Sequence, residues 1–372
     1  MTDNDKRIQV IVGEPLSRDI LSMDGAMVLA AKGTIVTQDM LKRLSNWIVE
    51  EDPRQPTERR ERKPASNRMR DEIIKKLEFD DIVSQKTREH IEQGIGDFFK
   101  DIGSSKNNVS ISNIEDSIAE LVDNTPDHPD VPLKLMQLRS HSSYLFQHSI
   151  ECGIIGSFIA SSLNYTQREI SSFSLAMMIH DTGVLSIPET IVNKPAKLTQ
   201  EEALMIKGHP IEGWNKIKQI PGVDPITLMI AIGHHITADG TGYPDTVDFN
   251  DLPPLVHLAS IIDHFEALTS ERPFRPAFAL HDAIKVILSQ RDKYHPAAIE
   301  NFISVVGIFP ISTFVQLSSG EIGVVTRNNQ DNLFLPEVKL VLDPAGKQYS
   351  KEILVNLSTD TYRYIVSALN SI

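Results

Sequence analysis

Hydrophobic positions divide the chain into stretches of different periodicity. Near the N-terminus, "IQVIVG" and "SMDGAMVLAAKGTIV" alternate as strands do around an Asp24-Gly25 turn, and residues 37–51 are predicted to form a helix. From about residue 126 to 305, apolar residues recur at helical spacing, as in "FSLAMMI", "DPITLMIAI" and "LVHLASII". After residue 309, "TFVQLSSGEIGVVTRN" and "EVKLVLD" are typical of strands, and "TDTYRYIVSALNSI" is predicted to be a closing helix.

The fold class expected from this pattern is mainly α. Residues 53–70, "PRQPTERRERKPASNRMR", change composition sharply and indicate a solvated linker rather than a functional basic patch. Residues 71–125 then return to helical periodicity. The predicted organisation is a small α/β N-terminal unit (1–52), a charged, proline-containing linker (53–70), a helical connector (71–125), an all-helical domain (126–308) and a short β-rich C-terminal extension (309–372).

The amino-acid composition limits which partners and which cellular compartment are expected. Hydrophobic residues make up 41% and charged residues 23% of the 372 residues, as in ordinary globular proteins. The net charge of −13 argues against binding DNA over a broad face. Cys152 is the single cysteine, so a disulfide framework is excluded. Neither a secretory signal nor an apolar stretch long enough for a membrane span is recognisable, and we expect a cytoplasmic protein.

Candidate catalytic and metal-binding residues are concentrated in the helical part, which contains most of the twelve histidines. Taken singly, each histidine there is more often a hydrogen-bonded core residue or polar surface than a ligand. Five predicted helices, however, each offer an imidazole or a carboxylate from an apolar segment: His148, His180 with Asp181, His209, His234 with His235, and Asp263. A buried charge of this kind is costly unless it is paired or bound to a cation.

Together these residues are enough to hold two divalent metal ions if Asp181 bridges them. Mixed nitrogen and oxygen ligands favour iron or manganese, with zinc as an alternative, over magnesium or calcium. Two such ions close together are a standard device for phosphoester hydrolysis.

The order of these residues, with "NKPAKLT", "HPIEG", "DGTGYP" and "DHFEALTSERPFR", resembles the HD-GYP subfamily of the HD phosphohydrolases over roughly residues 130–305. The resemblance implies an all-helical domain with a bimetal site and a phosphodiesterase that hydrolyses cyclic di-GMP to pGpG, with further cleavage to GMP left open. By position, it implies seven metal ligands, two of which, His180 and Asp181, are also the catalytic pair: His148, His180, Asp181, His209, His234, His235 and Asp263.

The resemblance also implies substrate and partner contacts. Arg272 and Arg275 stand where the family places cations that meet substrate phosphates. Gly242, Tyr243 and Pro244 form the GYP signature, which in the family lies near the site and contacts partner proteins with a GGDEF domain. A homodimer through residues 71–125 is a further expectation.

Four positions depart from the family pattern. Val184 stands where a lysine is usual, Ile236 where a glutamate is common, and Glu266 where aspartate is usual. Tyr144 replaces a glutamate found in three-metal members, so a third metal is not expected. Because groups around the ligands can change affinity or activity 10–100-fold, a weak or inactive module that binds cyclic di-GMP or a GGDEF partner is the alternative. An HD hydrolase for another nucleotide is a third reading.

Overall fold

The computed structural model describes residues 20–21, 28–30, 73, 83–104, 109–124, 144–194, 196–245, 247–271 and 277–370. The chain divides into two compact units, residues 1–63 and 64–372. In the first unit, strands β1 (Ile20–Leu21) and β2 (Val28–Ala30) pair antiparallel on either side of the predicted Asp24-Gly25 turn. The helix predicted over 37–51 and the linker 53–70 lie outside the described residues.

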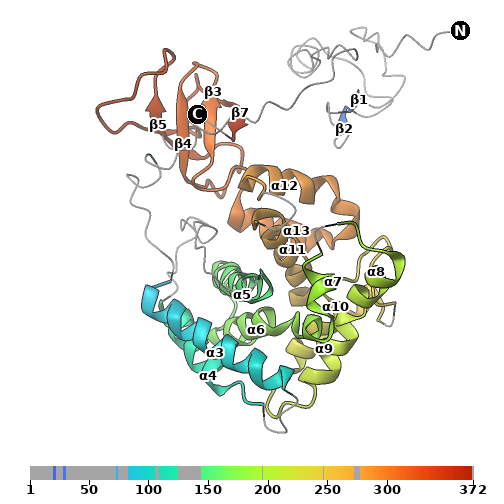
Figure 1. The fold of residues 1–372 in the computed structure, drawn as a ribbon. Coiled ribbons are helices and arrows are strands. Elements are labelled where there is room, and N and C mark those ends of the chain that lie inside the picture. Colours follow the sequence, from blue (N-terminus) through green and yellow to red (C-terminus); the bar gives the residue numbers. More distant parts are fainter. Residues whose placement is uncertain are drawn as a thin grey trace, which may run out of the picture. The chain divides into compact units, whose positions relative to one another are not determined.

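The second unit begins with two amphipathic helices, α3 (Gln85–Gly103) and α4 (Ser112–Asn124), within the stretch predicted as a helical connector. They pack against each other and against α5 and α6 (Figure 1). A buried ion pair joins α3 to α5, with Arg88 Nη1 3.2 Å from Glu151 Oε1. These helices therefore share one core with those that follow.

The described residues between 144 and 306 form helices joined by loops, as predicted (Figure 1). One apolar core joins these helices, and among the described residues no helix is both long and apolar enough to cross a bilayer. The elements are α5 (Tyr144–Ser162), α6 (Gln167–Ile179), η2 (Thr182–Ser186), α7 (Glu189–Val192), α8 (Gln200–Lys207), α9 (His209–Ile217), α10 (Pro225–Gly233), η3 (Phe249–Asp251), α11 (Pro254–Thr269), α12 (Leu280–Ser289), η4 (Arg291–Lys293) and α13 (Pro296–Val306).

Local capping signals set several of these boundaries. Thr199 and Glu202 form the expected capping box of α8, and Asp224 caps α10 with Pro225 at its first position. His209 follows the end of α8 by two residues and begins α9. Pro210 cannot donate the hydrogen bond that would continue α8, and it suits the first turn of a new helix.

The C-terminal part is an antiparallel sheet in the order β6-β5-β4-β3-β7. Its predicted strands are present, and apolar clusters cover both faces of the sheet. Asn328 donates to the carbonyls of Val305 and Val306 and so connects the sheet to the end of α13. The strands are β3 (Phe314–Leu317), β4 (Ile322–Arg327), β5 (Glu337–Leu342), β6 (Leu354–Asn356) and β7 (Ile365–Leu369).

The closing helix predicted from "TDTYRYIVSALNSI" was wrong, because Ile365–Leu369 form strand β7 paired with β3. Tyr364 and Val366 are exposed on either side of Ile365, whose side chain packs on the sheet core. This alternation and the aromatic and β-branched residues suit a strand. Pairing with β3 supplies backbone hydrogen bonds that the helical interpretation did not take into account.

Candidate metal centre

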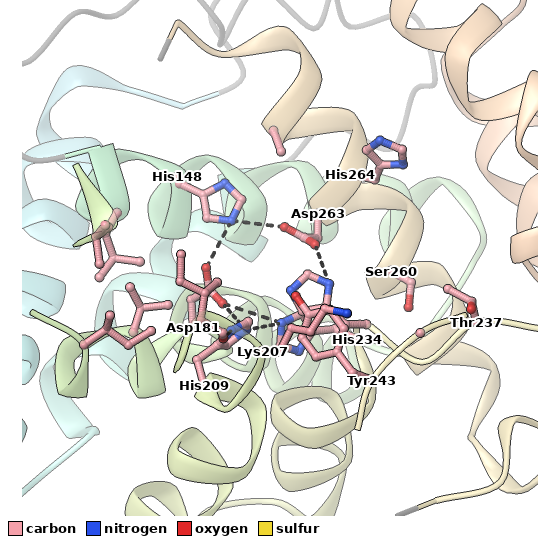
Figure 2. A pocket seen from close by; sticks show the side chains of 18 of the residues that line it. His148, Asp181, Lys207, His209, His234, Thr237, Tyr243, Ser260, Asp263 and His264 are labelled. Carbon is pink, nitrogen blue, oxygen red and sulfur yellow. Dashed lines mark hydrogen bonds and ion pairs between the residues drawn. The ribbon is translucent and has the colours of Figure 1, made fainter. Parts of the chain in front are cut away.

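The five predicted contributors meet at one place within the helical part (Figure 2). His148 comes from α5, His180 and Asp181 from the end of α6, and His209 from the start of α9. His234 and His235 follow α10, and Asp263 comes from α11. Asp181 and His235 are partly exposed and the other five are buried. The structure therefore brings together all seven residues expected as ligands.

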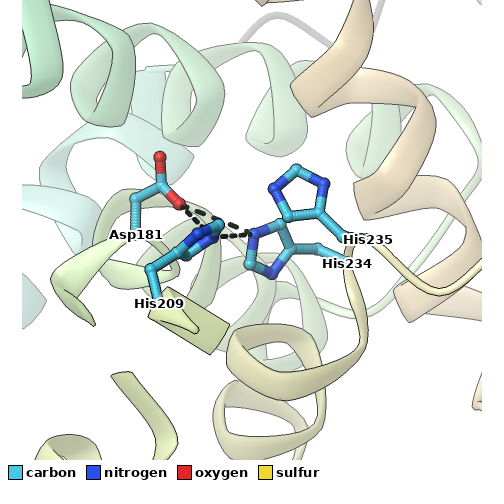
Figure 3. Close-up of side chains that lie close together, drawn as sticks. All are labelled: Asp181, His209, His234 and His235. Carbon is cyan, nitrogen blue, oxygen red and sulfur yellow. Dashed lines mark hydrogen bonds and ion pairs between the residues drawn. The ribbon is translucent and has the colours of Figure 1, made fainter. Parts of the chain in front are cut away.

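One group gathers around a single oxygen of Asp181 (Figure 3). Oδ1 of Asp181 lies 3.1 Å from Nε2 of His209 and 3.5 Å from Nε2 of His234. The Nε2 atoms of His209 and His234 are themselves 3.1 Å apart. His235 completes this group, and its ring centre is 4.1 Å from that of His234.

A second group, His148, His180 and Asp263, adjoins the first through Asp181. Nε2 of His148 is 3.2 Å from Oδ1 of Asp263 and 3.7 Å from Oδ2 of Asp181. Nε2 of His180 is 3.8 Å from the same oxygen of Asp263. Nε2 of His180 also lies 3.7 Å from Oδ1 of Asp181, so the Asp181 carboxylate contacts both groups.

Three of the histidines are oriented by the backbone. Nδ1 of His180 lies 2.7 Å from the carbonyl oxygen of Met177, and His209 and His234 make equivalent contacts to Ile206 and Ile230 at 2.7 and 2.8 Å. Because a carbonyl oxygen can only accept, each Nδ1 carries the proton. In the neutral rings, each Nε2 then presents a lone pair to the cluster.

His148 is oriented by a side chain instead. Its Nδ1 is hydrogen-bonded to Oε2 of Glu266, whose other oxygen accepts from the Ser270 hydroxyl. Glu266 is only 1% exposed. A carboxylate behind a histidine ligand fixes its tautomer and raises its basicity. In the sequence, Glu266 stood out only as a departure from the family pattern. Glu266 lies three residues after Asp263 on α11, and this helical spacing was the sequence feature that could have indicated its place beside the cluster.

The donor atoms fit a divalent cation. His180 Nε2 and Asp181 Oδ1 are buried without a hydrogen bond of acceptable geometry. The lone pairs of His209 and His234 would repel each other at 3.1 Å unless a proton or a metal ion lies against them. Imidazole and carboxylate donors suit iron, manganese or zinc. The cluster can therefore hold a divalent metal.

The charges of the cluster favour the same conclusion. Burial alone would raise the pKa of Asp181, but the neighbouring His180 and His209 outweigh it and hold that pKa well below its usual value. The pKa of Asp263 is likewise held well below its usual value, because hydrogen bonds with His148 and His180 outweigh the effect of burial. Burial, reinforced by His234, lowers the pKa of His235 well below its usual value. Charged carboxylates and a neutral imidazole are the forms that bind metals.

Gly242 allows the loop after the double histidine to turn back beside the cluster. A Cβ at Gly242 would lie 2.3 Å from the carbonyl oxygen of His235, so only glycine permits this approach. The ring of Tyr243 consequently lies against that of His235, with centres 4.7 Å apart. Pro244 is buried behind it. The GYP residues thus form one wall of the site.

A pocket of about 510 Å³ opens over the cluster. This volume is within the range of small-ligand sites. Val184, where the family has a lysine, lines the pocket, while Ile236 is 7% exposed in the core. Lys207 and Lys293 also line it, although nothing in the sequence distinguished them from other surface lysines. Arg272 and Arg275 lie outside the described residues.

Comparisons with known proteins agree with this geometry. Residues 135–298 match the HD domain, and residues 314–372 match the KOW domain associated with HD domain. A cyclic di-GMP phosphodiesterase of Pseudomonas aeruginosa is 27% identical over 249 residues, which cover 67% of this chain and 60% of that protein. A cyclic di-GMP phosphodiesterase of Vibrio cholerae is 36% identical over 34% of this chain and 27% of that protein.

A third relative carries a different substrate in its name. A 3'3'-cGAMP-specific phosphodiesterase of Vibrio cholerae is 29% identical over 39% of this chain and 34% of that protein. The matches span 60% or less of the length of all three relatives. Residues 135–298 therefore match the HD domain, in agreement with the resemblance seen in the sequence, and the three relatives are named as cyclic-dinucleotide phosphodiesterases.

Proposed function

We propose that the protein is a metal-dependent phosphodiesterase that hydrolyses cyclic di-GMP to pGpG, with GMP as a further product to be tested. The observation that carries this proposal is the position of Asp181 between the two groups: its carboxylate lies within 3.7 Å of His148 and His180 on one side, and within 3.5 Å of His209 and His234 on the other. A carboxylate shared in this way suits a site for two divalent ions. Iron or manganese are the favoured metals for these nitrogen and oxygen ligands.

Each ion would have its own ligands in addition to Asp181. His148, His180 and Asp263 would hold one, and His209, His234 and His235 the other. Two bound divalent ions supply the positive charge that stabilises the oxygens around phosphorus during displacement. The chain's own part is to hold the ligands through buried hydrogen bonds and to place the Tyr243 wall beside them.

The choice of substrate rests on the relatives and on the pocket. Two of the three relatives are named as cyclic di-GMP phosphodiesterases, and the pocket over the cluster has room for a small ligand. The third is named for 3'3'-cGAMP, another cyclic dinucleotide, which is therefore the competing substrate to test. Contact of the GYP loop with a GGDEF protein, a homodimer and a cytoplasmic location stay predictions.

The alternative, a module that binds without turnover, depends on Val184 and Ile236. Val184 provides no charge in the pocket, and Ile236 is buried in the core rather than beside the ligands. The complete set of seven converging side chains opposes this alternative, because binding a nucleotide does not require them.

The proposal is tested by loading the protein anaerobically with ferrous iron or manganese, counting metal by elemental analysis and following cyclic di-GMP by chromatography. For the wild type, we expect two metal ions per chain and pGpG as product. Asp181→Asn should lose turnover and bind fewer than two metal ions per chain. Asp251→Asn is the matched control, since Asp251 is exposed and does not line the pocket.

Two results would contradict this function. Metal and cyclic di-GMP that bind without turnover would show the binding module instead. A chain that retains no metal would remove the basis of the ligand assignment.

A further inference from the structure

We infer that Lys207 and Lys293 bind phosphates of the substrate in addition to Arg272 and Arg275, with Lys207 at the phosphate next to the metal centre and Lys293 at the second phosphate. This inference rests on the proposed function and adds to it the residues that recognise a cyclic dinucleotide. No residue is assigned to recognition of the bases.

The charge of the pocket requires such residues. A cyclic dinucleotide carries two phosphodiester charges, and burying an unpaired anion is costly. Among the described residues that line the pocket, Lys207 and Lys293 are the only lysine or arginine side chains. Within the described part of the chain, neither ammonium group is paired with a carboxylate at ion-pair distance. Both are therefore available to an incoming anion.

Lys207 lies close to the metal ligands (Figure 2). It is the last residue of α8, two residues before His209. Its Nζ is 5.5 Å from the centre of the Tyr243 ring, which in turn packs on His235. The aromatic ring steadies the ammonium group beside the cluster without neutralising it. This position suits the phosphate that undergoes cleavage.

Lys293 lies beside the loop that follows His235. Its carbonyl oxygen accepts from the backbone N–H of Ala238 at 2.9 Å. Hydrogen bonds from Thr237 and Thr241 lower the pKa of the exposed Asp239, and the positive charge of Lys293 adds to that effect. Its side chain therefore lies within electrostatic reach of Asp239 and lines the pocket. This position suits the phosphate that is not cleaved.

Two substrates separate the roles. Cyclic di-GMP has two phosphates, whereas bis(p-nitrophenyl) phosphate has one and reports on the metal centre alone. KM and kcat are measured for Lys207→Met and Lys293→Met, and a slowly hydrolysed bisphosphorothioate analogue of cyclic di-GMP gives the dissociation constant by calorimetry. Lys207→Arg keeps the charge.

Matched controls are available. Lys218 stacks on Trp214, with its Nζ 3.9 Å from the ring centre, outside the pocket lining, and so matches Lys207 on Tyr243. Lys285, paired with Asp282 outside the pocket, matches Lys293. Methionine at either control position is expected to change KM less than twofold.

We expect both pocket variants to raise KM for cyclic di-GMP and the dissociation constant of the analogue by about tenfold or more, the scale of a hydrogen bond to a charged group. With bis(p-nitrophenyl) phosphate, only Lys207→Met should raise KM. Lys207→Arg keeps the charge, and its KM should lie close to that of the wild type.

Unchanged constants in both variants, or equal losses on both substrates in Lys293→Met, would overturn the inference. Failure of the proposed function looks different. In that case the wild-type protein would cleave bis(p-nitrophenyl) phosphate but not cyclic di-GMP. Binding of the analogue to the two variants would then decide the role of the lysines independently.

Discussion

At the scale of residues, three of the candidate ligands owe their orientation to helix ends. The last carbonyl groups of a helix have no N–H partner within it. His180, His209 and His234 each follow such an end and hydrogen-bond a carbonyl three or four residues earlier. This contact fixes the orientation of each ring and turns Nε2 toward the cluster. A histidine just after an apolar helix is therefore well placed to be a ligand.

His148 lies inside α5, where carbonyls are already paired, so Glu266 takes over the orienting role. Glu266→Gln should weaken metal binding about 10–100-fold, because the neutral amide no longer raises the basicity of His148. Titration of the metal-free protein with manganese measures this directly.

The control for that change is Glu321→Gln. Glu321 is also buried, but it pairs with Arg363 in the C-terminal sheet. This variant should keep its metal affinity even if the sheet loses stability. If Glu266→Gln binds manganese within twofold of the wild type, Glu266 does not position His148.

At the scale of elements, the cluster depends on the close approach of η2 to α9. A Cβ on Gly183 would lie 1.9 Å from the carbonyl oxygen of His209. The glycine therefore lets the turn that carries Asp181 meet the helix that carries His209. Their side chains reach 3.1 Å only because the two backbones can touch.

Gly183→Ala should destabilise the protein by about 3 kcal/mol and lower its metal content, because the backbone of His209 must move away. Thermal unfolding and elemental analysis measure the two effects. Gly103→Ala is the control, since nothing lies within 4 Å of a Cβ there and the change should be neutral or slightly stabilising. Equal melting temperatures of the two variants would contradict this account.

At the scale of the whole molecule, the ion pair of Arg88 with Glu151 ties the connector helix α3 to the helix that carries His148. The pKa of Glu151 is raised to about 7, because burial, aided by the carboxylates of Glu266 and Glu92, outweighs the lowering effect of Arg88. The folded protein therefore holds this proton at a pH where the unfolded chain has released it.

Stability should fall as the pH rises from about 5 to 8, because the native state binds more protons than the unfolded chain in that window. The shift from the ordinary value of 4.5 corresponds to about 3 kcal/mol. Glu151→Gln removes this contribution. The melting temperature of the wild type, relative to that of Glu151→Gln, should decline from pH 5 to 8 in metal-free buffer. A constant difference would contradict the prediction, and effects of the cluster histidines cancel because both proteins contain them.

Much of the site could be predicted because its signals are local. Apolar periodicity placed the helices, and each candidate ligand lies within or directly beside such an apolar segment. These signals need only neighbours within one or two helical turns. The type of donor atom likewise follows from the residue itself, and so the sequence by itself determined the helices of this part and which side chains are candidate ligands.

Tertiary structure decided which of these groups meet and what surrounds them. Strand β7 was mistaken for a helix because its pairing with β3 joins residues some fifty positions apart. The contact of Glu266 with His148 spans 118 positions, and the pocket lysines share a wall with residues from several helices. Such distances are set by the packing of the whole core, which no local pattern encodes.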